Sequence, residues 1–138
     1  MEEIKLGVVG YVSQKFDEDK AKRLLKKTYN SIDCQYLSKQ KIVVSGLTDV
    51  GVISLAYKEA VLRGWKTVGI ACARAQEKVC FPVDKKIIVG NEWGDESPTF
   101  LEFIDVLVRV GGGRQSLAET AEFLKRGKPV FEYDLPSL

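Results

Sequence analysis

The sequence predicts a single α/β domain over residues 1–138, a Rossmann-like three-layer fold whose mainly parallel sheet is covered by helices on both faces. Short apolar runs alternate with amphipathic segments along the chain, the order expected of strand–helix–strand units. Most of these runs are continuously apolar, as in parallel strands that are buried on both faces. A chain of 138 residues is also long enough to build the core of one such domain.

Six strands and four helices are expected in alternation. The strands are predicted at residues 4–9, 41–45, 67–71, 86–89, 106–110 and 129–132. The first helix is predicted to begin at Asp17, and the second to span residues 50–63. The third is predicted to begin at Ser97 and Pro98, and the fourth to end at Arg126 and Gly127. Residues 72–85 lack a periodic pattern and are expected to form a long loop, a candidate lid or substrate-facing segment.

Capping residues mark several helix ends. Asp17 is a typical N-cap, and Ser97 followed by proline is another. Thr48 or Asp49 is expected to cap the helix over residues 50–63. That helix is apolar nearly all round, so we expect it to be buried against the sheet and to contribute to a homo-oligomer, a dimer or tetramer.

A glycine-rich segment joins the strand at residues 106–110 to the last helix. It comprises Gly111, Gly112, Gly113, Arg114, Gln115 and Ser116, with Glu119 one turn further on. Glycines let a ligand approach the backbone closely, and the first turn of a helix offers free N–H groups to an anion. The segment therefore predicts a phosphate site in which Ser116 donates a hydroxyl. The alternative is a tight turn followed by a solvated acid at Glu119.

The other polar loops follow the remaining strands. Because the carboxyl ends of parallel strands meet at one edge of a sheet, these loops should converge there on a ligand. The predicted ligand-binding residues are Gly10, Ser13, Gly46, Thr48, Asp49, Gly111, Gly112, Gly113, Arg114, Gln115 and Ser116. Trp93 is a candidate for stacking on a base, whereas Trp65 is expected to pack in the core. Asp95 and Glu96 are either solvated loop acids or working acids beside Glu119.

Composition excludes several classes of function. The net charge of +2 gives no case for binding nucleic acid, and no apolar run is long enough to span a membrane. The absence of histidine excludes serine–histidine and cysteine–histidine pairs, and histidine metal sites; we expect neither a metal nor a bound cofactor. Cys34, Cys72 and Cys80 are odd in number, which indicates reduced thiols in a cytoplasmic protein. The P-loop motif and the dinucleotide fingerprint after the first strand are both absent.

The segment from Gly111 to Glu119 resembles the Pro-Gly-Gly-x-Gly-Thr-x-x-Glu motif of the LOG family of "lysine decarboxylase-like" nucleotide-binding proteins. The segment from Ser45 to Val52 is similar to an earlier glycine-rich motif of that family, and Asp105 stands where the family has an aspartate. The resemblance covers most of the chain. It implies a Rossmann-like fold in which Gly112, Gly113 and Ser116 bind phosphate. It also implies that Glu119 contacts the ribose or stabilises an oxocarbenium-like state.

The chain departs from the family's enzymes at particular positions. Gly111 replaces the leading proline and Gln115 the third glycine. Glu96 and Ser97 stand where the enzymes have an arginine–lysine pair. Related molybdenum-cofactor carrier proteins and nucleotide-sensing domains share the fold without the hydrolytic chemistry.

Two functions follow from these residues. The first is a carrier or sensor that binds a nucleotide or phosphorylated small molecule at the glycine-rich loop. The second is a nucleoside 5′-monophosphate phosphoribohydrolase in which Glu119 is catalytic, with Asp95 or Glu96 as a second acid. The missing arginine and the lack of histidine favour the carrier or sensor.

Overall fold

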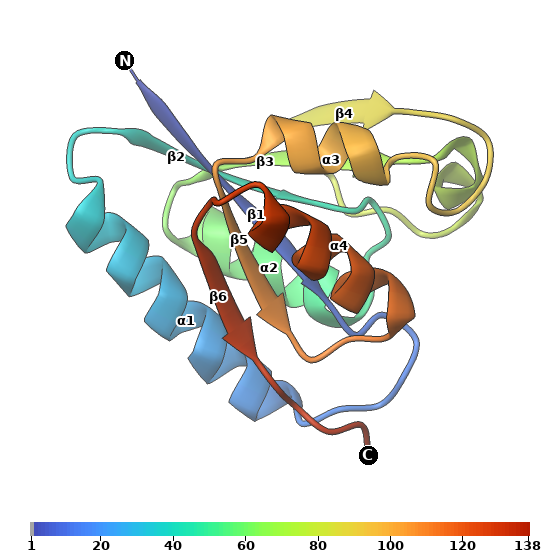
Figure 1. Cartoon of the computed structure of the whole chain (residues 1–138), viewed down its shortest axis with the longest axis horizontal. Helices are drawn as coiled ribbons and strands as arrows, with labels where there is room; N and C mark the ends of the chain where they lie inside the picture. The colour runs from blue at the N-terminus through green and yellow to red at the C-terminus, as the bar shows by residue number, and fades with distance from the viewer. Residues whose placement is uncertain (1) are drawn as a thin grey trace.

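Six parallel strands form one sheet in the order β4-β3-β2-β1-β5-β6 (Figure 1). The structure is a computed structural model that describes residues 2–138. The strands are β1 (Glu3–Gly10), β2 (Gln40–Ser45), β3 (Lys66–Ala71), β4 (Lys85–Ile88), β5 (Val106–Val110) and β6 (Val130–Tyr133). Every neighbouring pair is parallel, as the continuously apolar runs predicted.

Helices cover both faces of the sheet and complete the predicted three-layer fold. They are α1 (Glu18–Gln35), α2 (Gly51–Leu62), α3 (Ser97–Phe103) and α4 (Arg114–Lys125). In Figure 1, α3 and α4 lie in front of the sheet and α2 lies behind it. Helix α1 packs beside α2 in the same hydrophobic cluster. Among residues 2–138, no helix combines the length and the apolar character needed to cross a bilayer.

Alternation along the strands divides the core between the two faces. Leu6 and Val8 of β1 pack in the cluster that contains α1 and α2, whereas Val9 packs in the cluster that contains α3. Gly7 also faces α3, and a side chain there would collide with Ile104 and Phe100. Both faces of β1 are therefore buried, which explains why its sequence is apolar throughout.

The strand order reverses at β1, because β2, β3 and β4 lie on one side of it and β5 and β6 on the other. In an open parallel sheet, a ligand typically binds beyond the carboxyl ends of the strands at such a reversal. The loops that follow β1 and β5 lie at this point. One of them is the glycine-rich segment singled out in the sequence.

The predicted N-caps were only partly correct. Asp17 caps α1 and accepts a hydrogen bond from the amide of Lys20 at 3.1 Å, which confirms that prediction. Ser97 was wrong as the N-cap of α3, because Glu96 occupies that position and Ser97 is the first helical residue. The prediction of Thr48 or Asp49 for α2 was also wrong: Val50 is the N-cap, and no side chain caps the helix.

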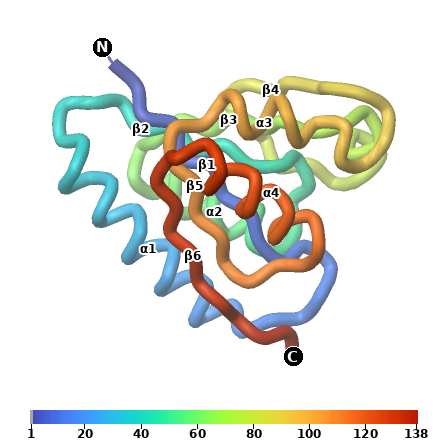
Figure 2. Tube along the Cα trace, in the orientation of Figure 1, coloured from blue at the N-terminus to red at the C-terminus, as the bar shows by residue number. Residues whose placement is uncertain are grey.

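The segment between β3 and β4 is not wholly irregular, because residues 73–77 form a short 3₁₀-helix, η1 (Ala73–Glu77). The amide of Asp49 donates to the carbonyl of Val79 at 2.9 Å, so this segment is held against the loop after β2. At the other end of the chain, Ser137 forms a bridge with Phe16 in the β1–α1 loop. Figure 2 shows the carboxyl-terminal tail running beside that loop.

Candidate functional site

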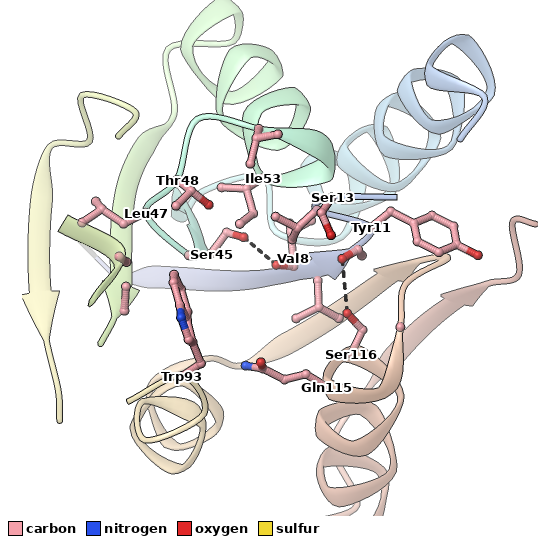
Figure 3. A pocket seen from close by; sticks show the side chains of 18 of the residues that line it. Val8, Tyr11, Ser13, Ser45, Leu47, Thr48, Ile53, Trp93, Gln115 and Ser116 are labelled. Atoms are coloured by element: carbon pink, nitrogen blue, oxygen red, sulfur yellow. Dashed lines mark hydrogen bonds between the residues drawn. The ribbon is translucent and has the colours of Figure 1, made fainter. Parts of the chain in front are cut away.

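A cavity of about 710 Å³ opens beyond the carboxyl ends of the central strands. Its walls come from the loops after β1, β2, β3, β4 and β5 and from the first turn of α4 (Figure 3). Its lining includes nine of the predicted ligand-binding residues: Gly10, Ser13, Gly46, Thr48, Asp49, Gly113, Arg114, Gln115 and Ser116. Glu119 lines it too. The convergence expected of the strand-end loops is therefore present.

The three glycines after β5 differ in their surroundings. Gly111 has a φ of 61°, and a side chain there would collide with the ring of Tyr11. Gly112 has a φ of 107°, and a Cβ there would lie 2.6 Å from the Cβ of Ser116. Neither is among the described residues that line the cavity, whereas Gly113 lines it and has no atom within 4 Å of an added Cβ. Gly111 and Gly112 thus let the turn pack tightly, and Gly113 borders the open space.

Arg109 of β5 anchors the glycine turn that follows this strand, a role that the sequence did not predict. Its guanidinium is buried at the end of β5 and donates to the carbonyl of Gly111 at 2.8 Å. It also pairs with Glu132 at 3.1 Å and with Asp134 at 2.6 Å. A charged residue inside the run Val-Leu-Val-Arg-Val was the available signal, because a buried arginine requires hydrogen-bonded partners.

The first turn of α4 presents free amides at the edge of the cavity. Among residues 2–138, no acceptor is found for the N–H groups of Gly113, Arg114, Gln115 and Ser116. No side chain caps this helix either. Unpaired amides and the helix dipole together favour an anion at this position.

Ser116 contributes differently from what the sequence suggested. Its hydroxyl is directed at the carbonyl of Gly10 and lies 3.3 Å from it, so it joins α4 to the end of β1 (Figure 3). The residue is buried, and its carbonyl accepts a hydrogen bond from the hydroxyl of Thr120. The amide of Ser116, rather than its hydroxyl, is the group left free for a ligand.

The turn after β2 forms the opposite wall and is held rigidly. The hydroxyl of Tyr57 lies 2.7 Å from the carbonyl of Gly46 and 2.9 Å from that of Val68. Burial raises the pKa of Tyr57, so this hydroxyl keeps its proton at neutral pH. Ser45 adds a second anchor, since its hydroxyl donates to the carbonyl of Val8 at 2.7 Å.

Thr48 stands out on this wall. Only 8% of the residue is exposed, it lines the cavity, and its hydroxyl has no hydrogen-bond partner among the described residues (Figure 3). Among residues 2–138 no buried side-chain oxygen lacks a partner, so this hydroxyl is open to the cavity and available to a ligand. Asp49 and Ser13 are exposed at the rim.

Two buried carboxylates lie side by side at the α3–α4 end of the cavity. Glu96 and Glu119 are each only 8% exposed. The amide nitrogen of Gln115 lies 3.0 Å from Glu96 Oε2 and 3.5 Å from Glu119 Oε2, so the two oxygens are no further apart than the sum of these distances. Such a separation lies within the range of up to about 9.5 Å at which carboxylate pairs cooperate in glycosidases.

The environment of Glu119 keeps its carboxyl less acidic than usual. Burial raises the pKa of Glu119, while hydrogen bonds from Ser97 and Gln115 oppose the shift. Ser97 Oγ donates to Glu119 Oε2 at 2.6 Å. The alternative that Glu96 is a solvated loop acid was wrong, because the residue is buried and accepts a hydrogen bond from the amide of Gly94 at 3.0 Å. Asp95 is exposed and accepts from the amides of Asn91 and Glu92.

Apolar side chains also line the cavity, together with Tyr11, Gln14 and Lys78. The apolar ones are Val8, Val9, Val12, Leu47, Val50, Ile53, Ile70, Ala71, Ala75, Val79 and Phe100. Trp93 also lines it and is 50% exposed, which leaves its ring accessible to a planar ligand (Figure 3). Trp65 stacks on Tyr29 with ring centroids 4.7 Å apart, as the expected core contact.

An α/β sheet of this topology, with its cavity at the strand ends, defines a Rossmann-like protein. No described protein family matches the sequence, and no curated protein matches it. Solved structures do match. The molybdenum cofactor carrier protein of Chlamydomonas reinhardtii is 27% identical over 95% of this chain and 76% of its own, with a TM-score of 0.73. The molybdenum cofactor binding protein of Rippkaea orientalis is 25% identical over 96% of this chain and 77% of its own, with a TM-score of 0.76.

These neighbours bear on the resemblance noted in the sequence. The neighbours have the Rossmann-like fold that the resemblance implied. They include molybdenum-cofactor carriers, the proteins that the sequence analysis named as relatives of the LOG family.

Proposed function

We propose that this protein is a carrier or sensor for a phosphorylated heterocyclic small molecule, either a nucleotide or a pterin cofactor such as the molybdenum cofactor. The phosphate occupies the first turn of α4, and the heterocycle lies over the apolar floor of the cavity. We further infer that the chain is related to the LOG family. A cytoplasmic location, expected from the cysteines, belongs to the same proposal.

The observation that carries this proposal is the run of free amides from Gly113 to Ser116 at the edge of a largely apolar cavity. The amides suit a phosphate, and Arg114 beside them adds a positive charge. A planar ring system suits the floor and Trp93. The two cofactor carriers among the structural neighbours support a carrier of this kind.

A pair of substitutions at Arg114 tests the phosphate site. Arg114 is the first residue of α4 and follows an extended Gly113, a position that accepts proline. Arg114→Pro removes both the amide and the side chain, whereas Arg114→Ala removes only the side chain. We expect calorimetric titration with GMP or a phosphorylated pterin to show binding about tenfold weaker for Arg114→Pro than for Arg114→Ala. Equal affinities would contradict the site.

Hydrolysis of an N-glycosidic bond is the second candidate function. The observation in its favour is the pair of buried carboxylates, because a raised pKa at Glu119 suits a general acid. In this reaction Glu119 would protonate the leaving base as a water molecule attacks the ribose, with Glu96 as the second acid beside it. The products would be the free base and ribose 5-phosphate.

Chromatography of nucleoside monophosphates incubated with the protein tests for this reaction. Release of base by the wild type, lost in Glu119→Gln, would establish hydrolysis. Binding without release would leave the carrier or sensor. The exposed Glu122, on the outer face of α4, provides the control variant Glu122→Gln.

A further inference from the structure

Four polar side chains form a hydrogen-bonded cluster at one wall of the cavity, where α3 meets α4; three of them line the cavity, and the fourth, Ser97, is bonded to Glu119. They are Glu96, Ser97, Gln115 and Glu119, called here the acceptor wall. The Ser97 hydroxyl donates its single hydrogen to Glu119 Oε2 at 2.6 Å. The amide nitrogen of Gln115 faces Glu96 Oε2 at 3.0 Å and Ser97 Oγ at 3.4 Å. All the side-chain donors of the wall are thus engaged within it, and what remains for a ligand is lone pairs.

The carboxylates of the acceptor wall are poorly hydrated but still have capacity to accept. Glu96 and Glu119 are both more than nine-tenths buried. Glu119 Oε1 has no hydrogen-bond partner among residues 2–138, although its residue lines the cavity. Among residues 2–138 no buried side-chain oxygen lacks a partner, so Glu119 Oε1 is open to the cavity and can accept a hydrogen bond from a donor on a ligand.

The same wall disfavours an anion. Two carboxylates repel a phosphate, which finds free amides and Arg114 at the first turn of α4 instead. The wall therefore faces an uncharged, donor-rich part of the ligand. Phe100 and Trp93 line the cavity in the same α3 region, and aromatic neighbours favour a flat ring over a sugar.

We infer that the acceptor wall selects a fused nitrogen heterocycle that carries a ring N–H next to an exocyclic amino group, the edge shared by guanine and pterins. The two adjacent donors of that edge match two adjacent carboxylate oxygens. Glu96 is the specificity-determining residue, and Glu119 and Gln115 complete the wall. This inference rests on the proposed function and specifies the heterocycle at the same site.

Three nucleotides with the same phosphate test the inference by calorimetric titration. GMP has the complete edge, IMP lacks only the exocyclic amino group, and dGMP lacks only the 2′-hydroxyl. We expect IMP to bind about tenfold more weakly than GMP, and dGMP to bind like GMP. Equal binding of GMP and IMP would overturn the inference, and weaker binding of dGMP alone would assign the wall to the ribose.

Variants test whether Glu96 causes the preference for GMP over IMP. Glu96→Gln should bring the affinities for GMP and IMP to within about threefold of each other, because the new amide presents a donor where the ligand also has one. Glu92→Gln is the matched control, since Glu92 is exposed on the same loop and pairs with Arg74 at 2.8 Å. It should keep the tenfold preference. Circular dichroism confirms that each variant is folded.

The outcomes separate the inference from the proposed function. If GMP, IMP and dGMP bind equally and Arg114→Pro weakens all three, the phosphate site stands and the inference fails. If no nucleotide and no phosphorylated pterin binds, both fail together. A preference for GMP that survives Glu96→Gln would also overturn the assignment to the acceptor wall.

Discussion

Gly112 and Gly113 adjoin in the sequence, yet a methyl group has different consequences at the two positions. Gly112 has a φ of 107°, and an added Cβ would lie 2.6 Å from Ser116 Cβ and 3.2 Å from Gly10 Cα. Gly113 has a φ of −96° and open space around it. We expect Gly112→Ala to lower the free energy of unfolding by about 1–3 kcal/mol in a urea titration.

Gly113→Ala is the control for that measurement. Its backbone already suits alanine, so its free energy of unfolding should stay within about 0.5 kcal/mol of the wild type. Similar losses at both positions would mean that the glycine turn is not packed as the structure has it.

Glu119 should make the stability of the protein depend on pH. Burial raises the pKa of this carboxyl above its ordinary value of 4.5, so the folded state holds the proton more tightly than the unfolded chain. The stability contributed by Glu119 is therefore complete below pH 4.5 and is lost as pH rises through the folded pKa. Glu119→Gln should raise Tm at pH 7, and the gain should shrink towards pH 4.

Scanning calorimetry across this pH range provides the check. Glu122→Gln, on the exposed side of the same helix, is the control and should not raise Tm at pH 7. A constant gain for Glu119→Gln would show that burial of the charge is not the cause.

At the scale of secondary-structure elements, Arg109 connects β5, the glycine turn and β6. The residue is only 4% exposed and contacts Gly111, Glu132 and Asp134. Arg109→Met would fill the space but leave the carbonyl of Gly111 without this donor. We expect a loss of about 1–3 kcal/mol in the free energy of unfolding, measured in urea.

Arg126→Met is the matched control at the end of α4. Arg126 pairs with Glu102 and Glu122 near the surface, at 3.3 and 3.9 Å. Exposed pairs of this kind contribute at most about 1 kcal/mol. An equal loss for both variants would contradict the anchoring role of Arg109.

Elements were predictable from sequence wherever local chemistry decides them. The six strands and four α-helices were found, and Asp17 before α1 and Gly127 after α4 mark helix ends as expected, because capping and left-handed glycines act locally. The predicted cap of α3 failed because a tertiary contact competes for the same side chain. Ser97 donates to Glu119 from another helix, and no pattern within α3 shows this.

The buried face of α4 is not its apolar one. Leu117, Ala121 and Leu124 recur at helical spacing, but all three are exposed. The side chains that face the sheet are Ser116, Glu119, Thr120 and Phe123. A polar inner face is needed beside the cavity, which periodicity alone does not reveal.

The whole molecule leaves that apolar stripe of α4 uncovered. Leu117 and Leu124 are 49% and 50% exposed, and Ala121 lies between them on the same face. Helix α2, on which the sequence-based expectation of an oligomer relied, is mostly buried within the chain, although Val61 and Leu62 at its end are exposed. We therefore expect the oligomer, if it forms through helices, to use α4.

Light scattering at micromolar concentration tests this expectation. The wild type should run as a dimer or tetramer, and Leu117→Lys combined with Leu124→Lys should run as a monomer. A similar charge change at Lys125, Lys125→Glu, should leave the oligomer intact. A monomeric wild type would contradict the prediction.

For the candidate site, the sequence predicted the place of the cavity, and most of the predicted ligand-binding residues line it, but the contacts among them were not predicted. The position followed from the parallel sheet, and the glycine-rich segment identified the turn whose amides have no acceptor among residues 2–138. The pairing of Glu96 with Gln115 and the engagement of the Ser116 hydroxyl by Gly10 were missed, because each joins segments whose relative placement only the fold determines.

The two outermost strands have a consequence for how the protein behaves at high concentration. Strands β4 and β6 are each four residues long; β4 begins with Lys85 and Lys86, and Glu132 of β6 is engaged by Arg109. Short edge strands that carry charged residues pair poorly with a strand from another molecule, and this protects against aggregation. Growth of the sheet from chain to chain is thereby discouraged, and self-association is directed to surfaces that form closed assemblies.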